Sequence, residues 1–107
     1  MERARRVLAR LHLDDVPEGT LRRVPHPPWD LTVARIGGEF YAIEDACPHS
    51  GQSLARGHIV GTQVICPAHD WHVCLRTGRV LTPAGCGANA AYEVAVEDDA
   101  LLVLAPP

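Results

Sequence analysis

The segments Cys47-Pro48-His49 and Cys66-Pro67-Ala68-His69 are separated by sixteen residues. Each segment offers one thiolate and one imidazole on a tight turn. The stretch between them has the length of a β-hairpin, so two loops can converge on one site. The proline after each cysteine fixes φ and removes a backbone donor beside the sulfur. The pattern predicts a metal centre with four ligands that arrive in two pairs, Cys47 with His49 and Cys66 with His69.

Two kinds of metal centre use two cysteines and two histidines. A structural zinc site accepts this set, but zinc modules usually pair cysteine with cysteine in one knuckle before the histidine pair. In this sequence each loop mixes the two residue types. A two-iron cluster in which two cysteines hold one iron and two histidines the other needs such mixed loops, because each loop must reach both irons. The iron–sulfur interpretation is therefore favoured, and the zinc site remains the alternative.

Short segments rich in β-branched and aliphatic residues flank the two loops. Residues 30–45 predict a β-hairpin about Gly37-Gly38. Residues 92–97 and 101–104 predict a second hairpin across an acidic turn, and residues 84–91 read as a loop. No sustained helical period occurs, although residues 2–11 could form a short helix on propensity alone. The expected fold is all-β and antiparallel, in one domain that spans residues 1–107.

Composition excludes several classes of protein. The 107 residues fit one domain, and 47% hydrophobic with 21% charged residues is typical of a globular chain. No apolar run approaches the roughly 20 residues of a membrane span. The net charge is −3, and residues 24–107 carry four Arg against nine acidic residues, so no nucleic-acid-binding face is expected. The N-terminus lacks a signal-peptide pattern, which favours a cytoplasmic chain whose clustered Cys and His bind metal.

The spacing Cys-x-His and Cys-x₂-His resembles that of the Rieske [2Fe–2S] family. The segment Asp70-Trp71-His72-Val73-Cys74-Leu75-Arg76-Thr77-Gly78 is similar to the family's continuation after the second histidine, and the resemblance runs from near Val7 to near Leu104. It implies a Rieske-like antiparallel β-sandwich with a small cluster-binding subdomain formed by two loops, about 46–56 and 65–72. It also implies one [2Fe–2S] cluster per chain, with Cys47 and Cys66 on the buried iron and His49 and His69 on the outer iron.

Departures from the family's high-potential members refine the expected function. Those members link the two cluster loops by a disulfide, and the corresponding positions are Gln52 and Ala68. They also place hydroxyl donors where this chain has Trp71 and Val73. Fewer hydrogen bonds to sulfur lower the reduction potential. The resemblance thus implies a low-potential ferredoxin, a one-electron carrier from a reductase to an oxygenase. No residues remain for a catalytic domain of its own.

A second resemblance leaves an alternative open. The segment Leu81-Thr82-Pro83-Ala84-Gly85-Cys86-Gly87, followed by Tyr92-Glu93-Val94, is similar to the small subunit of assimilatory NAD(P)H-dependent nitrite reductase. That assignment implies the nitrite reductase large subunit as the redox partner. The free-standing ferredoxin is ranked first and the nitrite reductase subunit second.

The remaining cysteines and histidines fall outside the ligand pattern. Cys74 lies in an expected strand and is interpreted as a small buried hydrophobe. Cys86 lies in a loop flanked by glycines. The four other histidines lack a partner at ligand spacing and are expected at the surface or in packing contacts: His12, His26, His58 and His72.

Overall fold

The computed structural model describes residues 6–26, 29–47, 51–68 and 70–106. Its strands are β1 (Val7–His12), β2 (Leu21–His26), β3 (Trp29–Ile36), β4 (Glu39–Glu44), β5 (His58–Val60), β6 (Gln63–Ile65), β7 (His72–Cys74), β8 (Val80–Thr82), β9 (Ala91–Tyr92), β10 (Val94–Glu97) and β11 (Ala100–Leu104). Two short 3₁₀ helices are η1 (Leu13–Asp15) and η2 (Leu54–Arg56). Within these described ranges no helix is long and apolar enough to cross a membrane.

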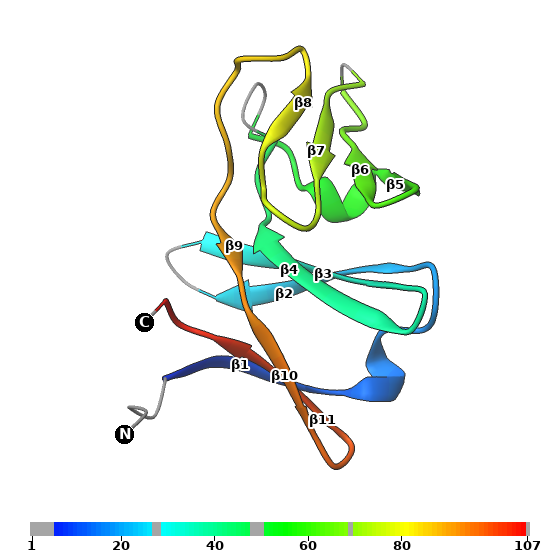
Figure 1. Ribbon diagram of the computed structural model, residues 1–107, viewed down its shortest axis with the longest axis vertical. Helices are drawn as coiled ribbons and strands as arrows, with labels where there is room; N and C mark the ends of the chain where they lie inside the picture. Colours follow the sequence, from blue (N-terminus) through cyan, green and yellow to red (C-terminus); the bar gives the residue numbers. More distant parts are fainter. Residues whose placement is uncertain (1–5, 27–28, 48–50, 69, 107) are drawn as a thin grey trace.

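The strands form three antiparallel sheets that lie one above another in Figure 1. The lower sheet has the order β1-β11-β10 and the middle sheet the order β2-β3-β4-β9. The upper sheet, β5-β6-β7-β8, lies beyond the middle sheet, at the end of the molecule opposite to the chain termini. The antiparallel all-β fold predicted from the turn spacing is confirmed.

Both faces of the middle sheet are buried, because each face meets a different apolar cluster. Leu31 and Val33 of β3 point into a lower cluster shared with β1 and β11. Ala34 of β3 and Ile43 of β4 instead belong to an upper cluster shared with β6 and β7. Alternate residues of a strand point to opposite faces, so one strand can serve both clusters. The middle sheet thereby joins the base of the molecule to the subdomain above it.

The predicted hairpin over residues 30–45 is formed by β3 and β4. Ile36 pairs with Glu39 across a two-residue turn, Gly37-Gly38, in which both glycines have positive φ. The carboxylate of Glu18 accepts hydrogen bonds from the N–H groups of Gly38 at 2.8 Å and Gly37 at 2.6 Å. These two bonds hold the pKa of Glu18 below its usual value. The turn is thus tied to the loop that precedes β2.

The second predicted hairpin differs from the expectation in one respect. Residues 92–97 do not form a single strand, since Tyr92 pairs with Ala42 of the middle sheet whereas Val94 pairs with Val103 of the lower sheet. The chain passes from one sheet to the other at Glu93. An alternating sequence pattern indicates that one side of a strand is buried, but it does not indicate which sheet the strand pairs with. The change of sheet at Glu93 therefore could not be predicted from the sequence.

Two further segments are decided by pairing between strands. The helix that propensity allowed over residues 2–11 is not formed in its described part, where β1 pairs with β11 and buries Leu11, in agreement with the first strand that the family resemblance implies near Val7. A ten-residue helix is marginal by itself, and pairing with a neighbouring strand outweighs its propensity. Strand β2 was not predicted, because Arg22, Arg23 and Pro25 interrupt its apolar pattern. It lies at the edge of the middle sheet, where a proline is tolerated.

The predicted loop over residues 84–91 folds back onto the turn that follows β7. Asn89 N–H donates to the Gly78 carbonyl at 2.7 Å, and Val80 N–H donates to the Gly87 carbonyl at 2.9 Å. Gly78 has φ +77°, and a Cβ built on it would lie 2.1 Å from the Asn89 carbonyl oxygen. The close approach of these two backbones therefore requires glycine at position 78.

We expect Gly78→Ala to lower the free energy of unfolding by about 2–5 kcal/mol, the sum of left-handed backbone strain and a steric clash. Gly85→Ala is the matched control, since Gly85 has φ +82° with nothing within 4 Å of a built Cβ. It should cost only about 1–2 kcal/mol. Urea denaturation followed by circular dichroism measures both, and equal losses would contradict the proposed backbone contact.

Candidate metal centre

Each cysteine of the predicted ligand set begins a loop, and the two loops are closed by equivalent pairs of backbone hydrogen bonds. Cys47 N–H donates to the Gln52 carbonyl at 2.8 Å, and Gly51 N–H donates back to the Cys47 carbonyl at 2.8 Å. Cys66 N–H likewise donates to the Trp71 carbonyl at 2.8 Å, and Asp70 N–H donates to the Cys66 carbonyl at 3.2 Å. The two ligand segments are thus built on one backbone pattern.

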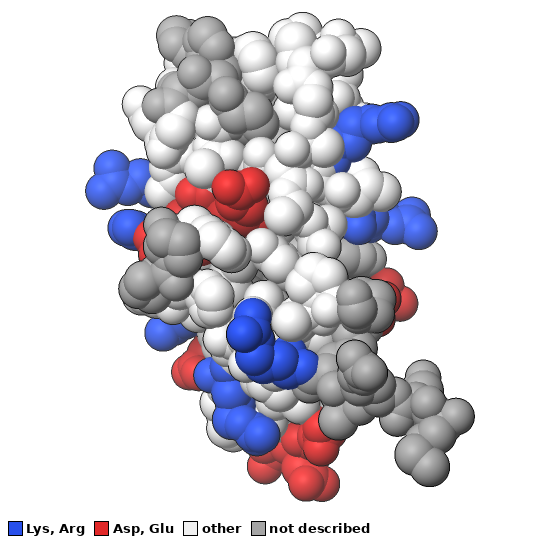
Figure 2. Space-filling model, turned by 90° about the vertical axis from the view of Figure 1, so that its left-hand side faces the viewer, with Lys and Arg blue, Asp and Glu red and all other residues white. Residues whose placement is uncertain are grey.

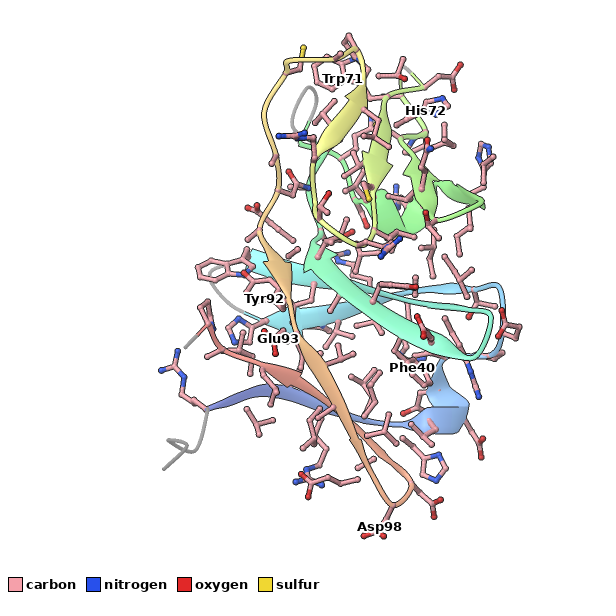
Figure 3. All side chains as sticks on the ribbon, viewed as in Figure 1. Phe40, Trp71, His72, Tyr92, Glu93 and Asp98 are labelled. Carbon is pink, nitrogen blue, oxygen red and sulfur yellow. The ribbon has the colours of Figure 1, made fainter. Side chains whose placement is uncertain are left out.

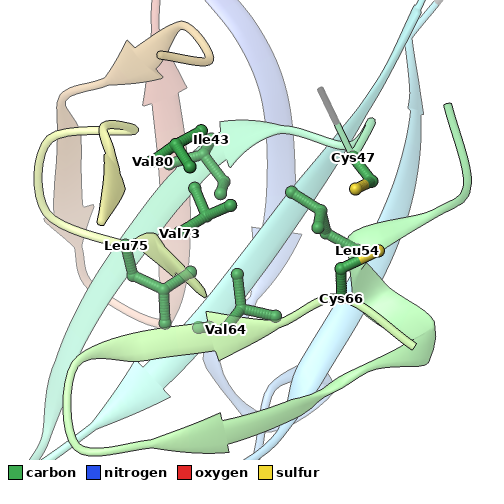
Figure 4. Close-up of a cluster of buried hydrophobic side chains, with 9 residues drawn as sticks. Ile43, Cys47, Leu54, Val64, Cys66, Val73, Leu75 and Val80 are labelled. Atoms are coloured by element: carbon green, nitrogen blue, oxygen red, sulfur yellow. The ribbon is translucent and has the colours of Figure 1, made fainter. Parts of the chain in front are cut away.

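Both cysteines are buried in the upper apolar cluster. Cys47 is 2% exposed and Cys66 is 0% exposed, and Figure 4 draws both side chains near Leu54 at one end of the cluster. Thiolates are soft donors, and burial keeps water from competing for the metal they bind. The structure therefore brings together two of the four predicted ligands, in surroundings that fit an iron–sulfur group.

The two predicted histidine ligands, His49 and His69, lie outside the described residues. In the sequence each histidine lies inside the segment that the closing hydrogen bonds of its loop span. His49 is two residues after Cys47, and His69 is three residues after Cys66. Their part in the ligand set remains a prediction.

Asn89 holds the backbone that leads into the first loop. Its side-chain amide donates to the Glu44 carbonyl at 3.1 Å and to the Ala46 carbonyl at 2.6 Å, and the residue is only 8% exposed. Sequence reasoning missed this residue, because it lies more than forty positions from the segment it supports. A lone asparagine in a loop of small residues carries no spacing signal that would have identified it.

The positions where high-potential relatives place hydroxyl donors carry none here. Val73 is fully buried in the upper cluster, and Trp71 is partly buried and packs against that cluster. Figure 3 places Trp71 at the upper end of the molecule. An indole at this place covers apolar surface and excludes water, but neither it nor the valine supplies an O–H to a ligand sulfur.

Cys74 and Cys86 are separate from the ligand pair. Cys74 ends β7, whereas the loop from Cys66 to Trp71 precedes that strand, so the two lie at opposite ends of it. The predicted strand position of Cys74 is confirmed, but its side chain is only partly buried. Burial raises its pKa, yet hydrogen bonds from the Thr77 side chain and from the Thr77 and Arg76 N–H groups outweigh this and lower it. Cys86 is exposed in its loop.

The four remaining histidines have surface or packing roles, as predicted. His12 accepts from Asp14 N–H at 3.0 Å, which caps η1. His26 packs against the Trp29 ring with centroids 5.7 Å apart. The ring of His72 hydrogen-bonds to the Gln63 amide oxygen at 3.0 Å, and His58 is exposed.

Comparison with known proteins identifies the family. The sequence profile of the Rieske [2Fe-2S] domain matches residues 7–98. The chain is 34% identical over 92 residues to the biphenyl dioxygenase ferredoxin subunit of Pseudomonas sp. (strain KKS102), covering 85% of this chain and 84% of the relative. A chain in the solved complex of reduced oxygenase and oxidized ferredoxin in carbazole 1,9a-dioxygenase is 31% identical, with TM-score 0.80 over 91% of this chain and 94% of that chain.

The chain belongs to the Rieske [2Fe–2S] domain family. The family resemblance, the fold and one [2Fe–2S] cluster per chain, all expected from the sequence, are thereby confirmed. A putative NADPH nitrite reductase small subunit is 23% identical with TM-score 0.76, over 92% of this chain and 100% of that chain. At that identity the likeness shows the shared fold alone.

We expect a midpoint potential near the lower end of the range of about −150 to +300 mV that Rieske centres cover. The physical reason is that Trp71 and Val73 provide no hydroxyl donor to stabilise the extra negative charge of the reduced centre. A redox titration followed by visible absorption measures the midpoint. A value in the upper half of the range would contradict the expectation.

Proposed function

We propose that this chain is a Rieske-type ferredoxin, a one-electron carrier that accepts electrons from a reductase and delivers them to an oxygenase. The observation that carries the proposal is the pair of equivalent loops that bury Cys47 and Cys66 in the same apolar cluster. The relatives support the acceptor, since the biphenyl dioxygenase protein is named a ferredoxin subunit and the carbazole dioxygenase structure is an oxygenase–ferredoxin complex.

The ligands in this proposal are those of the paired motif. Cys47 and Cys66 hold the inner iron, and His49 and His69 hold the outer iron, so each loop contributes to both metals. The burial of both cysteines supports their assignment to the inner iron, because that iron must lie on the protein side of the centre. When bound, the cluster takes up and releases one electron.

The protein's own contribution is to hold the ligands, exclude water and present one end of the molecule to partners. The closing backbone bonds fix the two cysteines, and the partly buried Trp71 covers the upper cluster. On the face shown in Figure 2, acidic residues lie at the lower end, where Figure 3 places Asp98, and also higher on the same face.

We further propose the whole chain, residues 1–107, as a single Rieske domain with cluster-binding loops at about 46–56 and 65–72. A cytoplasmic location is part of this proposal, because clustered Cys and His of this kind are more typical of a metal site than of a secreted disulfide scaffold. The carrier has no catalytic site of its own in this proposal, and its chemistry is limited to electron transfer.

The small subunit of an assimilatory nitrite reductase is the second candidate. It is favoured by the likeness of residues 81–87 to the sequence of that subunit. In the structure this segment is exposed and, with Val80, lines a cavity of about 650 Å³. The two candidates differ in their partner, a flavoprotein with sirohaem in one case and an oxygenase with its reductase in the other.

We expect Cys47→Ser and Cys66→Ser each to abolish cluster binding, because each removes a thiolate from the inner iron. Cys74→Ser and Cys86→Ser are the matched controls and should retain two irons and two labile sulfides per chain. Iron and sulfide analysis with visible absorption distinguishes them. A colourless wild-type protein that holds a single zinc would instead establish the structural zinc module.

Electron delivery is tested with purified partners. The photoreduced ferredoxin, mixed in a stopped-flow instrument with the oxidised oxygenase of a ring-hydroxylating system, should be reoxidised in a concentration-dependent way. Sirohaem-containing nitrite reductase large subunit is the comparison partner, and selective reoxidation by that protein would replace the first candidate by the second. Cys86→Ser is a control whose transfer rate should match the wild type.

A further inference from the structure

Asp45 carries an almost fully buried carboxylate beside the proposed centre. Its side chain is 1% exposed, and the residue stands directly after β4 and two positions before Cys47. A charge buried away from water is costly unless hydrogen bonds and opposite charges compensate it. Its surroundings therefore have to supply that compensation.

Four donors surround the two carboxylate oxygens. Oδ1 accepts from the Thr32 hydroxyl and from Ala55 N–H at 3.0 Å. Oδ2 accepts from the Ser53 hydroxyl at 2.7 Å and lies 3.6 Å from Arg23 Nε. An ionised carboxylate only accepts hydrogen bonds, so it satisfies all of these donors at once.

These contacts tie the first cluster loop to the middle sheet at both of its ends. Thr32 belongs to β3, whereas Ser53 and Ala55 follow the loop that is closed between Cys47 and Gln52. Asp45 itself precedes the loop, and its N–H donates to the Asp30 carbonyl at 2.9 Å. One side chain therefore connects the segment before the loop, the segment after it and the strand beneath.

The charged neighbours leave the negative charge only partly compensated. Arg23 also donates through Nε to Asp30 Oδ2 at 2.6 Å, so its positive charge is shared by two carboxylates. The Arg23 side chain is 58% exposed, and the exposed Arg56 lines the same cavity of about 290 Å³. Water screens both guanidinium groups more strongly than it screens the buried carboxylate.

We infer that Asp45 is a positioning residue that fixes the loop of Cys47 and, through its buried charge, lowers the reduction potential of the cluster. The inference rests on the proposed function, in which Cys47 is a ligand. Reduction adds one electron, and therefore one negative charge, near an existing buried negative charge. Coulomb repulsion in a medium of low dielectric makes that addition less favourable.

Asp45→Asn tests the charge while it keeps the size of the side chain and one oxygen acceptor. In cluster-loaded protein at a fixed ambient potential, the ratio of reduced to oxidised cluster should rise at least tenfold, a shift of about 59 mV for a one-electron couple. Asp30→Asn is the matched control, because it removes a carboxylate from the same arginine, and the Asp30 side chain accepts from Arg23 and from His26 N–H. Its shift should be less than half as large.

Arg23→Gln provides a test of opposite sign at an exposed position. Removal of the cation leaves the Asp45 carboxylate less compensated, so the ratio of reduced to oxidised cluster should fall. A residue with a structural role alone would not give opposite shifts for the two substitutions. If Asp45→Asn does not retain a cluster, the effect of charge is tested with Arg23→Gln alone. An unchanged or higher ratio of reduced to oxidised cluster in Arg23→Gln overturns the inference.

Ser53→Ala and Thr32→Val test the positioning role, since each keeps the charge and removes one hydrogen bond. Both should lose the cluster to a chelator at least threefold faster than the wild type, measured by the decay of visible absorption. If both variants lose the cluster at the wild-type rate, the positioning role is overturned. If cluster-loaded Asp45→Asn protein changes the ratio of reduced to oxidised cluster less than twofold, the charge effect is overturned. Failure of the proposed function would appear separately, as wild-type protein without iron and sulfide.

Discussion

Burial of both faces of the middle sheet is the constraint on which the rest of the structure depends. Val33 and Ala34 are neighbours in β3, yet they belong to different apolar clusters, one below and one above the sheet. Removal of apolar surface from water on both sides gives this sheet more stabilisation than an exposed sheet could have. It also makes the sheet a rigid support, because a close-packed layer resists displacement. The cluster-binding end is assembled on this support.

The connection from that support to the metal centre is polar. Asn89 holds two backbone carbonyls on either side of Asp45, and the Asp45 carboxylate gathers donors from β3 and from the segment after the first loop. Such groups are costly to bury unless every partner is present, so the network specifies one arrangement of the chain. The position of Cys47 follows from these contacts together with the closing bonds of its own loop.

Much of the fold and part of the site were predictable from the sequence, for local reasons. The glycine pair between two apolar segments requires a two-residue turn, and the structure has it at Gly37-Gly38. The cysteine pair was found from its spacing and lies together in the upper cluster. Strand β2 was missed, because an edge strand with arginines and a proline lacks the alternation that marks a half-buried strand. Its existence depends on pairing with β3, which is a contact between separate segments.

The sequence by itself predicted the chemistry of this protein: one cysteine and one histidine in each of two loops, with Gln52 and Ala68 at the disulfide positions and with Trp71 and Val73 at the positions of the hydroxyl donors. Only the tertiary structure decided the surroundings of that chemistry. Asp45 and Asn89 have no recognisable spacing, and their partners lie up to 45 positions away in the chain. Hydrogen bonds between distant segments depend on how the sheets pack, and local sequence patterns do not encode that packing.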